Sequence, residues 1–252
     1  EASGVLPLMI GRAARLFDYL VEKEKTYVAQ LKPGYATDTQ DAHGAILAGE
    51  GARATRAQLD AVLPQFIGDI AQIPPMYSAL KRDGQKLCDL ARQGIDVKVE
   101  PRPTQVYAID VLHENADGSF MLQIRCGRGT YIRTLCNDIG EALGTKAHMG
   151  VLLRTQTGMF TLDEAHTIEE IDAAEDLEPL LVAMDKPLGH LPKLDVQPKA
   201  ERFVRNGNQL TRRELIGDIQ LGKPTRLYLN GQFCGIGRFE GENLKFDAML
   251  LE

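Results

Sequence analysis

The stretch Arg125-Cys-Gly-Arg-Gly-Thr-Tyr-Ile-Arg-Thr-Leu135 decides the fold, because it joins two elements of different periodicity. Residues 120–126 alternate between apolar and polar side chains, as a half-buried strand does. From residue 130 the apolar side chains recur at helical spacing, and Gly144 ends this pattern. The sequence therefore predicts a strand, a Gly-containing turn and a helix over 130–143.

Arg133 falls in the first turn of this predicted helix. Backbone amides at a helix start, with guanidinium groups close by, form a site for an anion. A cation in the first turn opposes the helix dipole, so it costs stability unless an anionic group faces it. We interpret the stretch as an anion site, although an arginine on the solvent face of an amphipathic helix explains the spacing equally well.

The flanking sequence predicts an α+β domain followed by a small β-rich domain. A strand over 104–112 is expected to pair with 120–126 across a turn. Other strands are expected over 25–31, 96–99 and 150–157, and other helices over 10–20, 55–66, 85–93 and 167–174. Residues 193–252 are turn-rich, with a hairpin signal at Asn230-Gly231. We place the domains at 1–190 and 193–252.

The composition restricts the classes of function. The chain has 252 residues and a net charge of −6, which as a sum disfavours a nucleic-acid partner. The acidity is local, however: residues 159–190 hold nine acidic residues and one lysine, whereas 121–158 hold five basic and two acidic residues. The four cysteines form no CxxC pair, so we expect reduced thiols and no zinc site. No apolar run is long enough to span a membrane.

Two tyrosines are candidates for contact with nucleic acid. Tyr27 lies in the predicted strand 25–31 and would offer a base a stacking surface, although a core or edge-strand tyrosine is the commoner explanation. Tyr77 lies between Pro74-Pro75 and Lys81, in a basic stretch that the prolines keep irregular. An aromatic side chain among basic ones suits a nucleic-acid backbone, and an ordinary solvated loop is an equal alternative.

Several motifs together resemble the TruB-type tRNA pseudouridine synthases. They are Lys25-Thr-Tyr27, Thr37-Asp-Thr-x-Asp41-x-x-Gly44, Ile73-Pro-Pro-Met-Tyr-Ser-Ala-Leu-Lys81, Gly129-Thr-Tyr-Ile-Arg133-Thr with Asp138-Ile-Gly140, and Ala147-His148-x-x-x-Leu152-x-Arg154. Phe203-Val-Arg-Asn-Gly207 resembles the start of that family's PUA-like RNA-binding domain. The resemblance implies a pseudouridine synthase fold with a mixed, largely antiparallel sheet and flanking helices.

The resemblance also implies an activity, the isomerisation of a flipped-out uridine in the T-arm of tRNA to pseudouridine. Arg133 would pair with an Asp nucleophile and keep it ionised. Tyr27 would stack on the target base and take part in proton transfer, and Tyr131 and Leu152 would line the base pocket. The family's reaction needs no cofactor and no metal.

Contacts with the rest of the RNA are implied as well. Arg128 and Arg154 would hold phosphates near the site. Residues 72–99 would form a mobile, thumb-like loop that docks on the T-arm, with Tyr77 and Lys81 touching RNA. We expect a cytoplasmic monomer without a membrane partner.

The nucleophilic Asp of the family precedes the stretch that resembles Ala2-Ser-Gly-Val-Leu-Pro7. We therefore expect it ahead of Glu1, in an N-terminal segment that this chain lacks, so that the chain by itself would be inactive. Asp38 and Asp41 match other positions of the family. Two other classes of function remain open, a non-catalytic tRNA- or RNA-binding module and a structural protein of an RNA assembly.

Overall fold

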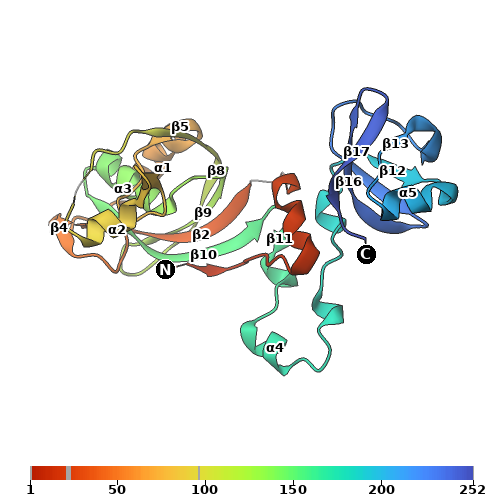
Figure 1. Cartoon of the computed structure of the whole chain (residues 1–252). Coiled ribbons are helices and arrows are strands. Elements are labelled where there is room, and N and C mark those ends of the chain that lie inside the picture. The colour runs from red at the N-terminus through yellow and green to blue at the C-terminus, as the bar shows by residue number, and fades with distance from the viewer. Residues whose placement is uncertain (1, 21–23, 96, 252) are drawn as a thin grey trace. The chain divides into compact units, whose positions relative to one another are not determined.

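The alternating residues around Arg125 form strand β9 (Phe120–Cys126), which pairs with the long strand β8 (Arg102–Glu114) in an antiparallel hairpin, as the sequence predicts. These strands belong to a computed structural model that describes residues 2–20, 24–95 and 97–251. The chain divides into two compact units (Figure 1). The first contains the described residues of Glu1–Leu6 and Lys23–Ala165, and the second those of Pro7–Glu22 and His166–Glu252. This division groups residues 166–190 with the C-terminal residues, whereas the domain boundary predicted from the sequence lies near residue 190.

The described residues of the first unit form a sheet of seven strands, and this sheet is mixed and largely antiparallel, as the resemblance implies. The strand order is β1-β10-β2-β9-β8-β5, and β11 pairs with β10. Only β1 and β10 run parallel in this sheet as described. The remaining strands are β1 (Ser3–Gly4), β2 (Lys25–Pro33), β5 (Gly68–Gln72), β10 (Ala147–Thr157) and β11 (Phe160–Thr161).

Helix α3 (Ile132–Leu143) packs against β2 and β10, and α1 (Arg56–Val62) packs beside it (Figure 1). Their apolar sides, which include Leu135 of α3, form one core with inward residues of the sheet such as Leu31 and Phe120. A capping box of Thr55 and Gln58, a local sequence signal of a helix start, begins α1 within the predicted helix 55–66. Gly144 ends α3 with φ 71°, a left-handed conformation that glycine adopts without strain. Helix α3 begins two residues later than predicted, so that Tyr131 is its N-cap residue.

Short elements complete the first unit. They are the strand pairs β3 (Ala36–Thr37) with β4 (Ile46–Ala48) and β6 (Lys81–Arg82) with β7 (Gln85–Lys86), helix α2 (Leu87–Arg92), and the 3-10 helices η2 (Leu63–Phe66) and η3 (Leu162–Glu164). The predicted strand over 96–99 is wrong for 97–99, which pair with no strand, and residue 96 lies outside the described residues. Val97 and Val99 instead line a pocket.

The second unit holds a six-stranded sheet in the order β13-β17-β16-β15-β12-β14, with a core around Leu194, Leu227 and Leu244. The hairpin at Asn230-Gly231 is present, and both residues have positive φ. Its strands are β12 (Lys193–Val196), β13 (Leu210–Thr211), β14 (Leu215–Ile216), β15 (Thr225–Leu229), β16 (Gln232–Glu240) and β17 (Asn243–Met249).

The second unit contains helices from two parts of the sequence, one before and one after the main segment of the first unit. The predicted helix over 10–20 is a 3-10 helix, η1 (Gly11–Tyr19), whose Leu16 is buried against Leu188 and Leu250. The others are α4 (Ile168–Ala173), α5 (Glu201–Arg205), η4 (Glu178–Leu180), η5 (Lys186–Leu188), η6 (Pro198–Ala200) and η7 (Arg212–Glu214). In the ranges that the structure describes, no helix combines the length and the apolarity needed to cross a membrane.

Candidate active site

A pocket of about 200 Å³ gathers four of the predicted site residues in the first unit. Tyr27 reaches it from β2, Leu152 from β10, and Tyr131 and Arg133 from the start of α3. Its other lining residues are Ala2, Asp41, Thr130, Ile132 and Met149. We call it the base pocket, after the role that the resemblance predicts for its residues. The sheet register and the α3 packing therefore bring together residues that lie more than a hundred positions apart in the sequence.

Arg133 faces an acid of this chain, Asp41. The Nη1 of Arg133 lies 3.3 Å from Oδ2 of Asp41 and donates to the Thr39 carbonyl oxygen at 3.4 Å. Asp41 is 6% exposed, and its Oδ1 accepts hydrogen bonds from the Thr39 hydroxyl (2.7 Å) and the His43 amide (3.1 Å). Arg133 thus has a carboxylate partner within this chain, Asp41, which no sequence signal indicated. The expected pairing of Arg133 with an Asp ahead of Glu1 stays a prediction.

The environment of Asp41 favours its charged form. Burial raises the pKa of Asp41, but the hydrogen bonds from Thr39 and His43 and the charge of Arg133 outweigh burial. The net result is a pKa below the ordinary value of an aspartate. Asp41 is therefore an ionised carboxylate whose oxygens are held by three donors at the edge of the base pocket.

Tyr27 is a protonated phenol at neutral pH. Burial, and secondarily Cys126, raise its pKa, while a hydrogen bond and the charge of Arg154 act in the opposite direction. Arg154 lies directly across the ladder from Tyr27, and its Nε donates to the Val5 carbonyl oxygen at 2.6 Å. The phenol can therefore donate a proton or accept a hydrogen bond beside a fixed guanidinium group.

Three cations interact in this region: Lys25, two residues before Tyr27 on β2, Arg154 opposite Tyr27 on β10, and Arg128 on the turn before α3. Burial lowers the pKa of Lys25, and the positive charges of Arg154 and Arg128 lower it further. Arg128 is exposed on the turn before α3, and Arg154 is half-buried on β10. We call Lys25, Arg128 and Arg154 the cation cluster. Like charges repel one another unless an anion lies between them, so the cluster suits a phosphate. The resemblance implies phosphate contacts for two of these cations, Arg128 and Arg154, whereas no sequence signal indicates Lys25.

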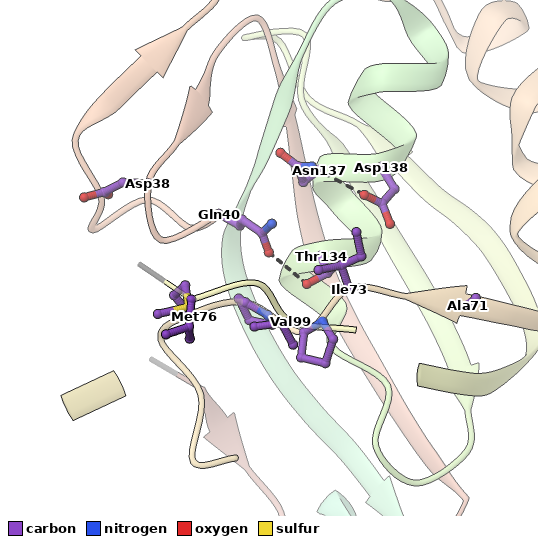
Figure 2. A pocket seen from close by; sticks show the side chains of 12 residues that line it. Asp38, Gln40, Ala71, Ile73, Met76, Val99, Thr134, Asn137 and Asp138 are labelled. Atoms are coloured by element: carbon purple, nitrogen blue, oxygen red, sulfur yellow. Dashed lines mark hydrogen bonds between the residues drawn. The ribbon is translucent and has the colours of Figure 1, made fainter. Parts of the chain in front are cut away.

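A second, larger pocket of about 480 Å³ is lined by Asp38 and Gln40 of the loop that also carries Asp41 (Figure 2). Gln40 points into it and accepts a hydrogen bond from the Thr134 hydroxyl at 2.8 Å. Its remaining lining residues are Ala71, Ile73, Pro74, Pro75, Met76, Val97, Val99, Asn137 and Asp138. Burial raises the pKa of Asp138, whose Oδ1 accepts a hydrogen bond from Asn137 at 3.4 Å. We call it the side pocket.

The remaining predicted contacts lie outside both pockets. Tyr77 is half-buried one residue after Met76, and Lys81 is exposed on β6. Their predicted contact with RNA stays a prediction. Within 2–20, 24–95 and 97–251, no three His, Cys, Asp or Glu side chains are grouped so that they could hold a metal ion.

Comparisons with known proteins relate the whole chain to one family. The model of the TruB family pseudouridylate synthase N-terminal domain matches residues 1–132, and that of the tRNA pseudouridylate synthase B C-terminal domain matches 133–189. The chain is 40% identical to the tRNA pseudouridine synthase B of Alkaliphilus oremlandii, over 99% of this chain and 85% of that protein. It is 38% identical to that of Clostridium perfringens strain 13, over 100% and 86%.

Solved structures share the fold. An H/ACA RNP bound to a substrate RNA containing 2′-deoxyuridine matches with a TM-score of 0.69 at 21% identity, over 100% of this chain and 73% of that one. A Cbf5-Nop10-Gar1 complex matches with a TM-score of 0.66 at 24% identity, over 97% and 72%. The α+β fold with its mixed sheet is thus confirmed. With two family models along residues 1–189 and relatives that match nearly end to end, the chain belongs to the TruB family of pseudouridylate synthases.

Proposed function

We propose that this protein converts a uridine in the T-arm of tRNA to pseudouridine, with the target base in the base pocket. One observation carries the proposal: Tyr27, Tyr131, Leu152 and the Arg133–Asp41 ion pair surround one pocket, in a member of a pseudouridylate synthase family. Aromatic and apolar walls suit the faces of a flipped-out base. We expect the protein to act as a cytoplasmic monomer.

The reaction is an isomerisation, so no atom is gained or lost overall. The glycosidic C1′–N1 bond breaks, the base rotates, and C1′ bonds to C5 of the same ring. The proton on C5 then leaves and N1 gains one. Tyr27, as a protonated phenol beside the base, is placed to stack on it and to exchange a proton. The isomerisation requires no oxidant and no group donor, so we expect no cofactor and no metal.

The nucleophile in this proposal is an Asp that precedes Glu1. Ala2 lines the base pocket. Because the family's Asp precedes the stretch that resembles residues 2–7, we propose that this Asp acts in the same pocket. Arg133 would then face two carboxylates, Asp41 and the nucleophile. A single guanidinium group offers five N–H donors, which is enough to hold both. Asp41 keeps Arg133 in place, and Arg133 keeps the nucleophile ionised and aimed at the base.

Tritium release tests the activity directly, because forming the new carbon–carbon bond expels the hydrogen on C5. A T-arm stem-loop labelled with [5-³H]uridine is incubated with the 252-residue chain and with a chain extended by the residues that its gene encodes ahead of Glu1. We expect release by the extended chain and none by the 252-residue chain. Release by the 252-residue chain would contradict the assigned nucleophile, and RNA binding without release by either chain would favour a binding module.

The RNA surface predicts a steep dependence of affinity on salt. Phosphate contacts release counterions, so log Kd should change linearly with log salt concentration. We expect Arg128→Gln to lower this slope by about one, because one phosphate contact is lost. Arg56→Gln is the matched control, because Arg56 is exposed on α1 and pairs with Asp60 at 2.8 Å. An unchanged slope for Arg128→Gln would remove Arg128 from the RNA surface.

A further inference from the structure

Gln72, the last residue of β5, makes two hydrogen bonds to a single residue of the base pocket. Its Nε2 donates to the Tyr131 carbonyl oxygen at 3.2 Å, and its Oε1 accepts from the Tyr131 amide at 3.0 Å. Gln72 is 2% exposed, so neither bond competes with water. The side-chain amide therefore matches both polar groups of the Tyr131 backbone and fixes where that backbone lies.

Tyr131 depends on this outside partner. It is the N-cap residue of α3, and its own side chain makes no capping hydrogen bond. Its carbonyl oxygen also accepts the helix bond from the Leu135 amide at 3.0 Å. The start of α3 is the segment that carries Tyr131 and Arg133 into the base pocket. Whatever moves the Tyr131 backbone therefore moves both side chains.

Gln72 also immediately precedes the segment 73–101, which we expect to contact RNA. Gln72 pairs with Arg102 across the β5–β8 ladder, and the chain between these two residues carries Tyr77 and Lys81. Its neighbours Ala71 and Ile73 line the side pocket, while Gln72 itself bonds Tyr131 in the wall of the base pocket. Alternation along the strand thus places Gln72 between the two pockets.

We infer that Gln72 is a positioning residue that links docking of RNA on the 73–101 segment to the geometry of the base pocket. It touches neither the base nor the reacting atoms. It holds the start of α3 so that Tyr131 and Arg133 face the target, and it is anchored where the RNA-contacting segment leaves the sheet. This inference rests on the proposed function for its catalytic consequence, but the hydrogen bonds themselves can be tested without catalysis.

Two variants separate the hydrogen bonds from simple packing. Gln72→Met keeps the approximate size and removes both bonds. Gln72→Glu keeps the shape and, when ionised, loses the donor to the Tyr131 carbonyl oxygen. A neutral carboxyl group regains that donor, and burial raises the pKa of a carboxyl group placed there. Gln123→Glu and Gln123→Met are the matched controls, because Gln123 is exposed on β9 of the same sheet.

The activity test uses the extended chain at saturating T-arm RNA. At pH 8 we expect both Gln72 variants to lower the single-turnover rate by about 10- to 100-fold, the effect of misplacing reacting groups, with Kd changed less than threefold. As the pH falls to 5.5, the ratio of Gln72→Glu to wild type should recover at least fivefold, while the ratio for Gln72→Met stays flat. Asp41, Arg102, Tyr131 and Arg133 are present in wild type and in every variant, so dividing each rate by the wild-type rate at the same pH removes the pH dependence that all these proteins share.

Amide hydrogen exchange on the 252-residue chain supplies the readout that is independent of activity. We expect the Tyr131 amide to exchange at least tenfold faster in Gln72→Met, with the β2–β9 ladder unchanged. The inference would be overturned by any of three results. The Gln72 variants could react within threefold of the wild-type rate at every pH, the Gln123 variants could lose as much activity as the Gln72 variants, or the Tyr131 amide could exchange at the wild-type rate. Should wild type release no tritium, the proposed function fails, and the exchange result still decides whether Gln72 positions α3.

Discussion

Tyr27→Ala should abolish useful turnover of the extended chain while leaving RNA binding nearly intact. The ring lines the base pocket and its phenol is protonated at neutral pH, so the variant loses both a stacking surface and a proton-transfer group. General acid–base groups contribute about 10²–10⁴-fold to a rate, and we expect a loss in that range for single turnover. The measurement is tritium release at saturating T-arm RNA beside a binding titration.

Two companions sharpen this prediction. Tyr27→Phe keeps the ring and removes only the hydroxyl, and we expect its rate to lie between those of wild type and Tyr27→Ala. The loss from wild type to Tyr27→Phe then measures proton transfer, and the further loss to Tyr27→Ala measures stacking. Tyr107→Ala is the matched control: Tyr107 lies on β8, outside both pockets, under the Arg125 guanidinium group at 5.5 Å. Lost binding with normal turnover per bound complex would contradict the role of Tyr27.

Arg133→Met should have a comparably large effect, through the carboxylates that Arg133 holds. The variant keeps the stem that packs in the pocket but removes the guanidinium group 3.3 Å from Asp41. Removing one preorganised electrostatic partner costs about 10²–10³-fold in kcat, and we expect a loss of that size. A rate within threefold of wild type would show that the ion pair has no part in turnover.

The same variant should change how stability depends on pH. In wild type the pKa of Asp41 is lower in the folded than in the unfolded protein, so its ionisation stabilises the fold above the unfolded pKa. This contribution is lost as the pH falls through the folded pKa. Arg133→Met raises the folded pKa, so the acid limb of unfolding should move to higher pH. Arg56→Met, which breaks an exposed pair, is the control and should leave that limb in place.

Local signals predicted the elements that carry the site. The capping box at Thr55, the left-handed Gly144 and the Asn230-Gly231 turn are each decided by a few neighbouring residues, and all three are present. The strand prediction over 96–99 failed for 97–99 because apolar alternation there serves the wall of the side pocket and no strand pairs with it. The helix over 10–20 has the predicted place, yet its hydrogen bonding is that of a 3-10 helix.

The site residues that the sequence did not predict are defined by contacts between positions far apart in the chain. The position of Arg133 in the first turn of a helix predicts an anionic partner. Asp41 lies 92 residues away in the sequence, however, and only the packing of the 38–41 loop on α3 brings it to Arg133. Lys25 joins Arg154 and Arg128 through the register of β2, β10 and the turn before α3. Gln72 carried no sequence signal, since a buried glutamine at a strand end is recognised only by what it bonds.

Position-resolved detection of pseudouridine in an isolated T-arm stem-loop is the most direct test of the central claim. The extended chain is incubated with the stem-loop in EDTA without any added cofactor, and the RNA is mapped nucleotide by nucleotide. We predict stoichiometric conversion of one T-loop uridine and none in Tyr27→Ala. No conversion by the wild-type extended chain, or conversion only at uridines outside the T-loop, would contradict the account.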